Sequence, residues 1–236
     1  MTPMEVSVIV PTYNRAHRLA RCLDSIPWRV HDNLEVVVVD DGSTDDTSRV
    51  LNAFIDLGAP LRLVKLNTNR GAGAARVAGV SNSAGAVVMW LDSDDEWLPG
   101  AFETMLNELN STDRGAVVQG QLFHRIEHGL AWPEWVPEPM RDGPTFGTQF
   151  GAMAMARDIF EKYPIKESLR LAEDFEWELR VQRSGIQIRR FLKPVLVRWI
   201  GADNLCHERV QADEFLHPVL LGHARELAKA KRIRDE

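Results

Sequence analysis

The sequence predicts an α/β protein with a mainly parallel sheet flanked by helices, built as a single large domain. Four short apolar runs are separated by segments long enough for helices, and each run leads into a polar loop. The runs are continuously apolar rather than alternating, which is typical of parallel strands buried on both faces. A length of 236 residues is ample for one such domain with a sizeable core.

The first two predicted strands end in polar loops. Residues 6–10 form the first strand, which breaks at Pro11. Residues 34–39 form the second and run into an acidic loop, where Gly42 allows a tight turn. The Ser, Thr and Asp residues of this loop are suited to cap a helix that continues to Phe54.

The third and fourth predicted strands follow the same pattern. Residues 61–66 precede a glycine-containing turn and a helix near residues 77–84, and residues 86–90 form the fourth strand. Three carboxylates follow it directly, namely Asp92, Asp94 and Asp95. Because neighbouring carboxylates repel, a hard divalent cation would stabilise them and bridge to an anionic group such as a diphosphate. Taken alone, this short motif also fits a solvated acidic turn.

The four polar loops are expected to meet at one edge of the sheet. Right-handed crossovers place the carboxyl ends of parallel strands together, and ligands of open α/β sheets bind outside those ends. One crevice should therefore be surrounded by Tyr13, Asp40, Asp41, Arg70, Asp92, Asp94 and Asp95.

The second half of the chain carries weaker signals. Residues 115–123 and 187–196 are predicted strands, and residues 175–183 a helix. Residues 132–139 contain three prolines, which exclude a regular helix or a central strand there and predict a loop. Residues 147–155, rich in small residues and Met, are expected to pack beneath a binding site, which the resemblance described next makes the acceptor site.

Five motifs occur in order and at consistent spacing: residues 8–15, 39–45, 69–71 with Arg76, 92–95 and 172–180. Together they resemble the family 2 glycosyltransferases of the GT-A fold, strongly over residues 4–110 and loosely over residues 145–200. The resemblance implies a Rossmann-like GT-A domain in which residues 1–112 bind a nucleotide sugar and residues 113–236 bind an acceptor. It also implies an inverting single displacement by an acceptor hydroxyl.

The resemblance assigns the donor contacts to Pro11, Thr12, Tyr13, Asn14, Asp40, Asp41, Arg70, Arg76, Asp92, Ser93 and Asp94. Tyr13 is expected to stack on the base, or else to pack on the following helix. Asp41, with Asp40 as second choice, would accept a hydrogen bond from the imide N–H of uracil or thymine, which favours UDP or dTDP sugars. Arg70 and Arg76 would contact phosphates, order the acidic loop, or form ordinary ion pairs.

The same resemblance implies a divalent cation, Mg²⁺ or Mn²⁺. Asp94 and Asp95 are the expected metal and ribose contacts, while Asp92 would shape the strand end or bind the metal through water. Mg²⁺ usually takes one or two carboxylates together with substrate phosphates and waters, and Mn²⁺ suits the same oxygen ligands. The cation would act as a Lewis acid toward the departing nucleoside diphosphate.

An acidic pair later in the chain supplies the candidate catalytic base. By resemblance Asp174 is the general base, with Glu173 as second choice. Acidic residues in a first helical turn also offset the helix dipole, which is the structural alternative. Trp132 and Trp135 would line an acceptor-sugar platform or, equally, anchor their loop.

One departure from the family pattern concerns the segment after the last predicted strand. Many relatives carry a histidine there, whereas this chain has Asp203 and Asn204 without it. His207 would substitute for that histidine or be an ordinary surface residue.

Bulk properties restrict the partners. A net charge of −6 and a pI near 5.7 argue against nucleic acid or an anionic membrane as partner. Cys22 and Cys206 make no disulfide framework. No apolar run approaches about 18 residues and no signal-peptide pattern occurs, so we expect a cytoplasmic protein without integral membrane segments. Residues 217–236 predict an amphipathic helix that docks on the core or pairs two copies as a homodimer.

Two other function classes fit parts of the pattern. A nucleotidyltransferase would need a glycine-rich, basic loop after the first strand, which residues 11–15 do not provide. A non-catalytic nucleotide-sugar-binding protein would retain Tyr13 and Asp41 without needing Asp174. The sequence identifies neither the sugar nor the acceptor, which could be a small molecule, a glycan, a lipid-linked glycan or a peptide.

Overall fold

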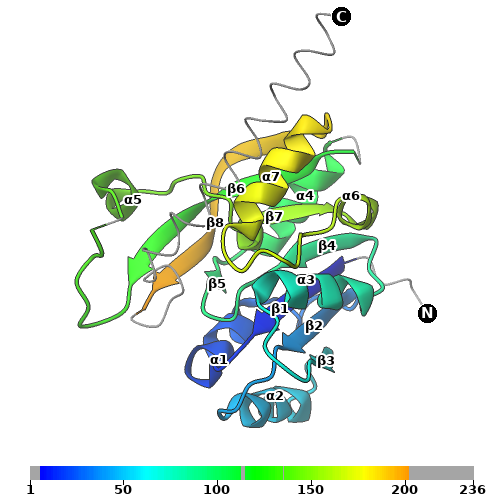
Figure 1. Ribbon diagram of the computed structural model, residues 1–236, viewed down its shortest axis with the longest axis vertical. Coiled ribbons are helices and arrows are strands. Elements are labelled where there is room, and N and C mark those ends of the chain that lie inside the picture. The colour runs from blue at the N-terminus through cyan, green and yellow to red at the C-terminus, as the bar shows by residue number, and fades with distance from the viewer. Residues whose placement is uncertain (1–5, 113–114, 135, 202–236) are drawn as a thin grey trace, which may run out of the picture.

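An eight-stranded sheet in the order β3-β2-β1-β4-β7-β6-β8-β5 runs through the computed structural model, which describes residues 6–112, 115–134 and 136–201 (Figure 1). Its first four strands are parallel, as predicted. They are β1 (Val6–Thr12), β2 (Leu34–Asp40), β3 (Leu61–Lys65) and β4 (Val87–Trp90). Every residue of β1 and β2 is buried, which explains their continuously apolar sequences.

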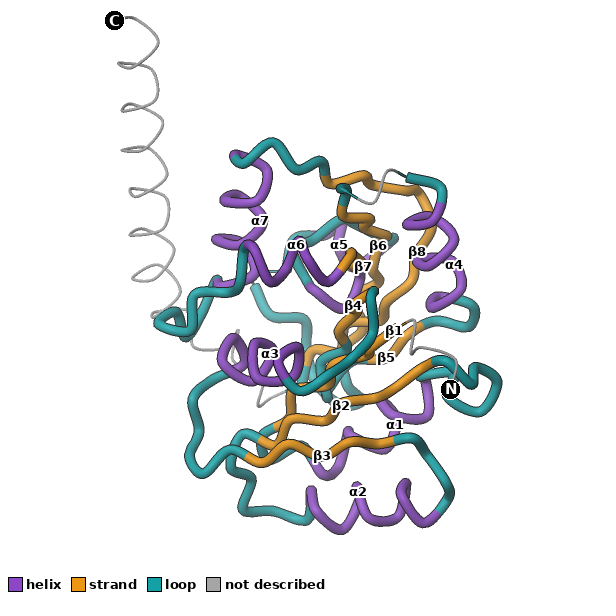
Figure 2. The backbone as a smooth tube through the Cα atoms, turned by 90° about the vertical axis from the view of Figure 1, so that its right-hand side faces the viewer, coloured by secondary structure: helices purple, strands orange, loops and turns teal. Residues whose placement is uncertain are grey.

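Helices cover both faces of this sheet, as Figure 2 shows in a view turned by 90°. Val8 and Val36 belong to one core cluster, while Ile9 and Val37 belong to a second cluster on the other face. The first cluster includes residues of α1 (Ala16–Ser25), α2 (Thr47–Asp56) and α4 (Ala101–Asn110). The second includes residues of α3 (Ala72–Ser81), α6 (Arg157–Lys162) and α7 (Glu173–Arg183).

The second half extends the sheet with mixed strand directions. β6 and β8 are parallel to each other, β7 is antiparallel to β4 and β6, and β5 is antiparallel to β8. The sequence predictions do not include β5, β7, α4, α5 and α6. Four of these have only two to six residues, which leaves too little periodicity to detect. The ten-residue α4 carries a helical stripe of buried residues, namely Ala101, Phe102, Met105 and Leu109, which is its sequence signal. The bounds are β5 (Glu96–Trp97), β6 (Val117–Ile126), β7 (Met153–Ala156), β8 (Ile188–Ile200), α5 (Glu138–Asp142) and the 3₁₀ turn η1 (Phe150–Ala152).

Several helices and strands have bounds that differ from the predicted ones. The helix expected near residues 77–84 spans Ala72–Ser81. It follows Gly71, whose φ of 93° is a backbone conformation that favours glycine. The predicted strand 187–196 continues to Ile200 as β8. The predictions for Trp135, Asp203, Asn204, His207 and the helix 217–236 lie outside the described residues.

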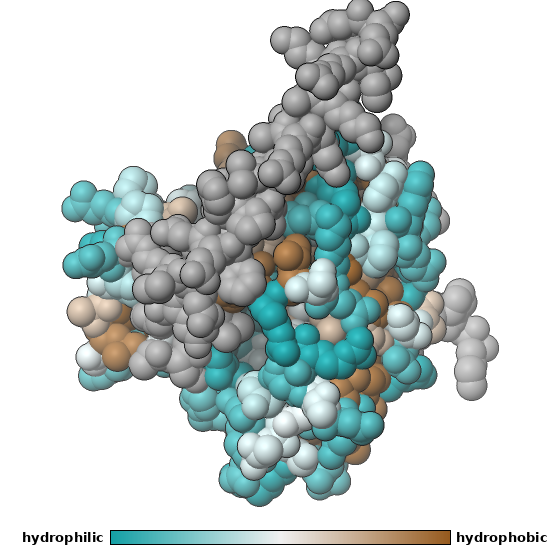
Figure 3. All heavy atoms as spheres, in the orientation of Figure 1, coloured by the Kyte–Doolittle hydropathy of each residue, from teal (hydrophilic) through white to brown (hydrophobic). Residues whose placement is uncertain are grey.

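The described part of the chain contains no helix long and apolar enough to cross a membrane. On the face shown in Figure 3, hydrophilic residues cover most of the coloured surface and hydrophobic residues gather in small groups.

Candidate functional site

The carboxyl ends of β1, β2 and β4 lie side by side. Thr12 is opposite Asp40 in the parallel register, and the Asp41 N–H donates to the Thr12 carbonyl at 2.9 Å. The Leu91 N–H donates to the Ile9 carbonyl at 3.0 Å, which places the acidic loop beside the end of β1. The polar loops predicted to meet at one edge of the sheet are therefore brought together.

The loops after β1 and β2 are joined through Asn14. Its backbone is left-handed, with φ of 51°, and its N–H donates to Ser43 Oγ at 2.9 Å. Its side-chain Oδ1 accepts the Thr44 N–H at 2.8 Å. Tyr13, next to it, is 41% exposed, so its ring remains available at the mouth of the site. Asn14 is thus a structural connector, whatever else it contacts.

Asp40 and Asp41 are both buried and both hold backbone. Asp40 Oδ1 accepts the Ser43 N–H at 2.8 Å, closing the turn after β2. The two oxygens of Asp41 accept the N–H groups of Arg70 and Gly71 at 2.8 and 2.7 Å. A carboxylate oxygen has two lone pairs, so each Asp41 oxygen retains room for one further donor. Asp41 therefore fixes the loop before α3 and still has acceptor capacity.

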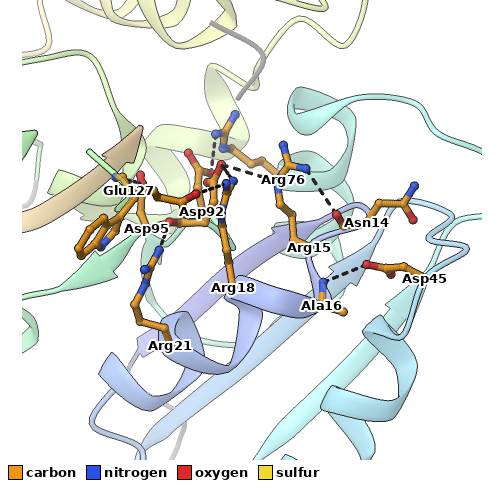
Figure 4. Close-up of polar contacts among 12 residues, drawn as sticks. Asn14, Arg15, Ala16, Arg18, Arg21, Asp45, Arg76, Asp92, Asp95 and Glu127 are labelled. Carbon is orange, nitrogen blue, oxygen red and sulfur yellow. Dashed lines mark hydrogen bonds and ion pairs between the residues drawn. The ribbon is translucent and has the colours of Figure 1, made fainter. Parts of the chain in front are cut away.

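The acidic loop distributes its carboxylates among different partners (Figure 4). Asp92 Oδ1 accepts a hydrogen bond from Arg76 at 2.7 Å, and Asp95 Oδ1 accepts the Trp199 N–H at 3.0 Å. Asp94 Oδ2 lies 3.7 Å from Arg15 Nε and 4.0 Å from Arg18 Nη1. Ser93 between them is buried. Among residues 6–112, 115–134 and 136–201, no three His, Cys, Asp or Glu side chains are arranged to hold a metal ion.

Negative charge nevertheless accumulates at this loop. Burial raises the pKa of Asp95 well above its usual value, and Asp94 and Asp92 raise it further. Burial and Asp92 also raise the pKa of Asp94, against the opposing effect of Arg15 and Arg18. A cation would relieve this repulsion. The donor set therefore fits a divalent ion at Asp94 and Asp95, whereas Asp92 is already paired with an arginine.

Arg76 of α3 connects the acidic loop to the acidic pair of α7. The side chain is buried, with Nη2 bound to Asp92 and Nη1 bound to Glu173 Oε1 at 2.7 Å. Burial lowers the pKa of Arg76, but Asp92 and Glu173 outweigh that effect and leave its pKa above the usual value. Arg76 is thus an ion-pair partner that orders the acidic loop. Arg70, the other predicted arginine, instead pairs with Glu167 near the surface.

The acidic pair begins α7 after a strained residue. Ala172 has φ of 58°, a left-handed conformation that is uncommon for residues other than Gly, Asn or Asp. Glu173 is 9% exposed, and burial raises its pKa while Arg76 opposes the rise. Asp174 is less buried, and its Oδ2 accepts a hydrogen bond from Thr148 Oγ1 at 2.9 Å. The two carboxylates therefore have different partners.

Several residues at the site carry no sequence signal. Thr148 lies 26 residues before Asp174, and Arg18 pairs with Glu127 across 109 residues, so neither contact follows from a local motif.

Trp132, one of the two predicted acceptor-site tryptophans, is half-buried, and the Arg141 guanidinium lies 5.8 Å from the centre of its ring. This contact supports an anchoring role for Trp132 in the loop before α5.

Solved structures share this fold. A mannosyltransferase from Pyrobaculum calidifontis, in complex with GDP-Man and Mn²⁺, superposes with a TM-score of 0.72 at 20% identity, covering 95% of this chain and 65% of that one. TarS from S. aureus superposes with a TM-score of 0.68 at 22% identity, covering 94% and 65% of the two chains. The fold is therefore that of the GT-A glycosyltransferases.

Curated relatives match at the level of sequence. Chondroitin synthase from Pasteurella multocida is 34% identical over 93% of this chain and 23% of its own length. The chain spans 36% of an uncharacterized glycosyltransferase from Nostoc sp. and 38% of the glycosyltransferase GlyG from Streptococcus pneumoniae, and so little more than a third of either. The family model described as Glycosyl transferase family 2 matches residues 7–164. The chain belongs to glycosyltransferase family 2.

Proposed function

We propose that this chain transfers a sugar from a nucleoside diphosphate sugar to an acceptor hydroxyl. One observation carries the proposal: buried Arg76 joins Asp92 of the acidic loop to Glu173 of the acidic pair. A site for a donor diphosphate and a site for proton removal are thereby held at one edge of the sheet. Family membership supports the reaction class, as do TarS structures with UDP and UDP-GlcNAc.

The donor is proposed to carry uracil or thymine, as UDP or dTDP sugar. Tyr13 would stack on the base, and Asp41 would accept the imide N–H with its remaining acceptor capacity. Support comes from the exposure of Tyr13 and the rigid hold of Asp41 on the Arg70 and Gly71 amides. The mannosyltransferase bound to GDP-Man marks the alternative of a purine donor.

Mg²⁺ or Mn²⁺ is the proposed cofactor, held by Asp94 and Asp95. When bound, it supplies Lewis-acid stabilisation of the negative charge that develops on the leaving diphosphate. Burial is the main cause of the raised pKa values of both carboxylates, and repulsion by neighbouring carboxylates adds to it. That repulsion supports the assignment, because a cation would relieve it.

Asp174 is the proposed general base, and inversion at the anomeric carbon is the proposed outcome. The acceptor hydroxyl attacks that carbon as the bond to the diphosphate breaks, and its proton passes to a carboxylate oxygen of Asp174. Glu173 is disfavoured because Arg76 holds it at 2.7 Å in a buried ion pair. Asp174 is the more exposed of the two and is oriented by Thr148.

Replacing each acidic residue separately tests this assignment. We expect Asp174→Asn to lower kcat by about 10²- to 10⁴-fold with an unchanged Kd for the nucleotide, because only proton transfer is lost. Glu173→Gln should instead weaken folding through Arg76 and reduce kcat less. Chromatography measures the rate of product formation from a panel of nucleotide sugars, and this rate gives kcat. Unchanged kcat in a folded Asp174→Asn variant would favour a non-catalytic nucleotide-sugar-binding protein.

A further inference from the structure

Arg18 is a buried arginine of α1 that the proposed reaction does not use. It is 4% exposed, and its guanidinium meets Glu127, the residue after β6, through two contacts. Nε lies 2.6 Å from Oε1, and Nη2 donates to Oε2 at 2.7 Å. One hydrogen bond and one close ion-pair contact thus hold the guanidinium against the Glu127 carboxylate. Arg18 therefore connects α1 to the end of β6, as Figure 4 shows.

The surroundings leave Arg18 little freedom to move. A Cβ atom added to Gly201 would lie 2.0 Å from Arg18 Nη2 and 2.7 Å from Glu127 Oε2. The ion pair thus fills the space beside the backbone that follows β8. Arg15, by contrast, has a side chain that is 17% exposed at the start of α1. Arg21 donates to the Asp94 carbonyl at 3.1 Å with a side chain that is 33% exposed, so Arg18 is the most buried of these three arginines that contact Asp94.

Arg18 also faces the acidic loop. Its Nη1 lies 4.0 Å from Asp94 Oδ2, while the other two nitrogens contact Glu127. Glu127 largely balances the charge of Arg18, so the pair acts as a dipole whose positive end, at Arg18 Nη1, faces Asp94. This positive end partly offsets Asp94 before any ligand arrives, repels a lone divalent cation and attracts the phosphates of a nucleotide.

We propose that Arg18, anchored by Glu127, is a positioning residue that makes cation binding depend on the donor diphosphate. This role rests on the donor site proposed above: Asp94 binds a cation firmly only when the nucleotide is bound as well. Without the diphosphate, Arg18 disfavours the cation. With it, the added negative charge offsets Arg18 and the cation binds firmly. The two ligands are thereby coupled, and the coupling is reciprocal.

Calorimetric titration measures this coupling as the ratio of the Mn²⁺ Kd without UDP to that with UDP. We expect Arg18→Met to tighten the binding of Mn²⁺ alone, to weaken the binding of UDP alone, and to lower the ratio by about tenfold. The double variant Arg18→Met/Glu127→Gln removes the carboxylate left without its arginine, and should show the same loss of coupling in a stable fold. Arg49→Met, at an exposed ion pair with Asp46 on α2, is the control and should match the wild type.

The outcomes separate this role from the proposed function. Wild-type coupling in the folded double variant, or weaker binding of Mn²⁺ alone in either variant, would overturn the role of Arg18 and leave the glycosyltransferase proposal intact. A wild-type protein that binds neither Mn²⁺ nor UDP would overturn both.

Discussion

The two ends of the central sheet both bury carboxylates, but they hold them in different ways. At the amino end, Glu35 accepts hydrogen bonds from Ser7 Oγ at 2.7 Å and from the Gly85 N–H at 3.2 Å. Arg157 closes the same cluster, donating to the carbonyls of Gly85 and Val80. At the carboxyl end, Asp94 faces Arg15 and Arg18 at 3.7 and 4.0 Å.

The difference separates a structural cluster from the proposed ligand site. Ser7 Oγ and backbone N–H groups donate to Glu35, so the amino end needs no ligand. At the carboxyl end, burial and mutual repulsion raise the pKa values of Asp94 and Asp95, and the proposed cation would relieve that repulsion. Perturbed carboxylates in such a position are typical of functional sites. Substitutions at the amino end should therefore lower stability alone, whereas substitutions at the carboxyl end should also weaken ligand binding.

The largest loss of stability is expected at Arg76, which joins Asp92 of the acidic loop to Glu173 of α7. Arg76→Met leaves Asp92 and Glu173 as poorly compensated carboxylates, which should lower the free energy of unfolding by about 3–5 kcal/mol. Donor binding should weaken as well, because the acidic loop loses its hold. Urea denaturation and nucleotide titration measure the two effects. A stability loss below about 1 kcal/mol would show that the buried pair is not the link between loop and helix.

At the amino end, Glu35→Gln should destabilise the fold without affecting the reaction. Ser7 Oγ and the N–H groups of Ala84 and Gly85 all donate to Glu35 Oε1. A neutral amide oxygen accepts such bonds less strongly than a carboxylate oxygen, so we expect a loss of about 1–2 kcal/mol. The variant should keep the wild-type kcat and nucleotide Kd. A fall in kcat at a temperature where the variant is fully folded would contradict the division between the two ends.

The stability of the fold should also depend on pH through a buried histidine, His124 of β6. Burial, with help from Arg198, lowers its pKa to about 4, so the folded protein keeps His124 neutral. The unfolded chain takes up a proton near pH 6.5, and the native state therefore loses stability between about pH 6.5 and 4 and no more below that.

We expect this loss to reach about 3 kcal/mol in the wild type and to be absent from His124→Gln. Because carboxylates also titrate in this range, the quantity to compare is the difference in the free energy of unfolding between the wild type and His124→Gln at each pH. Urea denaturation at pH 7, 5.5 and 4 supplies it. Parallel curves for the two proteins would contradict a neutral buried histidine.

The smallest effect is expected at the surface. Arg49 and Asp46 form an ion pair at 3.1 Å with both side chains more than two-thirds exposed. Arg49→Met should change the free energy of unfolding by less than about 0.5 kcal/mol. A larger change, measured by the same denaturation, would mean that short distances alone determine stability and would weaken the comparison of the two ends.

Sequence patterns predicted the strands that lie in continuous apolar runs. Such runs identified β1 to β4 and their parallel direction, and most of β6 and β8, whereas the short strands β5 and β7 were not predicted. Motifs also located Asp92, Asp94 and Asp95, because their spacing is local. They could not show which carboxylate each arginine would pair with.

Pairing depends on contacts between distant segments. The bond from Thr148 to Asp174 and the pair of Arg18 with Glu127 require the folded sheet to bring them together. Asp41 illustrates the same limit: its residue type suggested base recognition, while its hold on the Arg70 and Gly71 amides became visible only in the structure.

Nucleotide binding tests the central claim most directly. Titration calorimetry with UDP, dTDP, GDP and ADP, in Mn²⁺, Mg²⁺ or chelator, compares the wild type with Asp94→Ala/Asp95→Ala and with Glu35→Gln. We predict metal-dependent binding of UDP or dTDP that chelator removes, that the double variant loses, and that Glu35→Gln keeps. Absence of nucleotide binding to the wild type under every metal condition, or undiminished binding to the folded double variant, would contradict the assignment of this edge as the donor site.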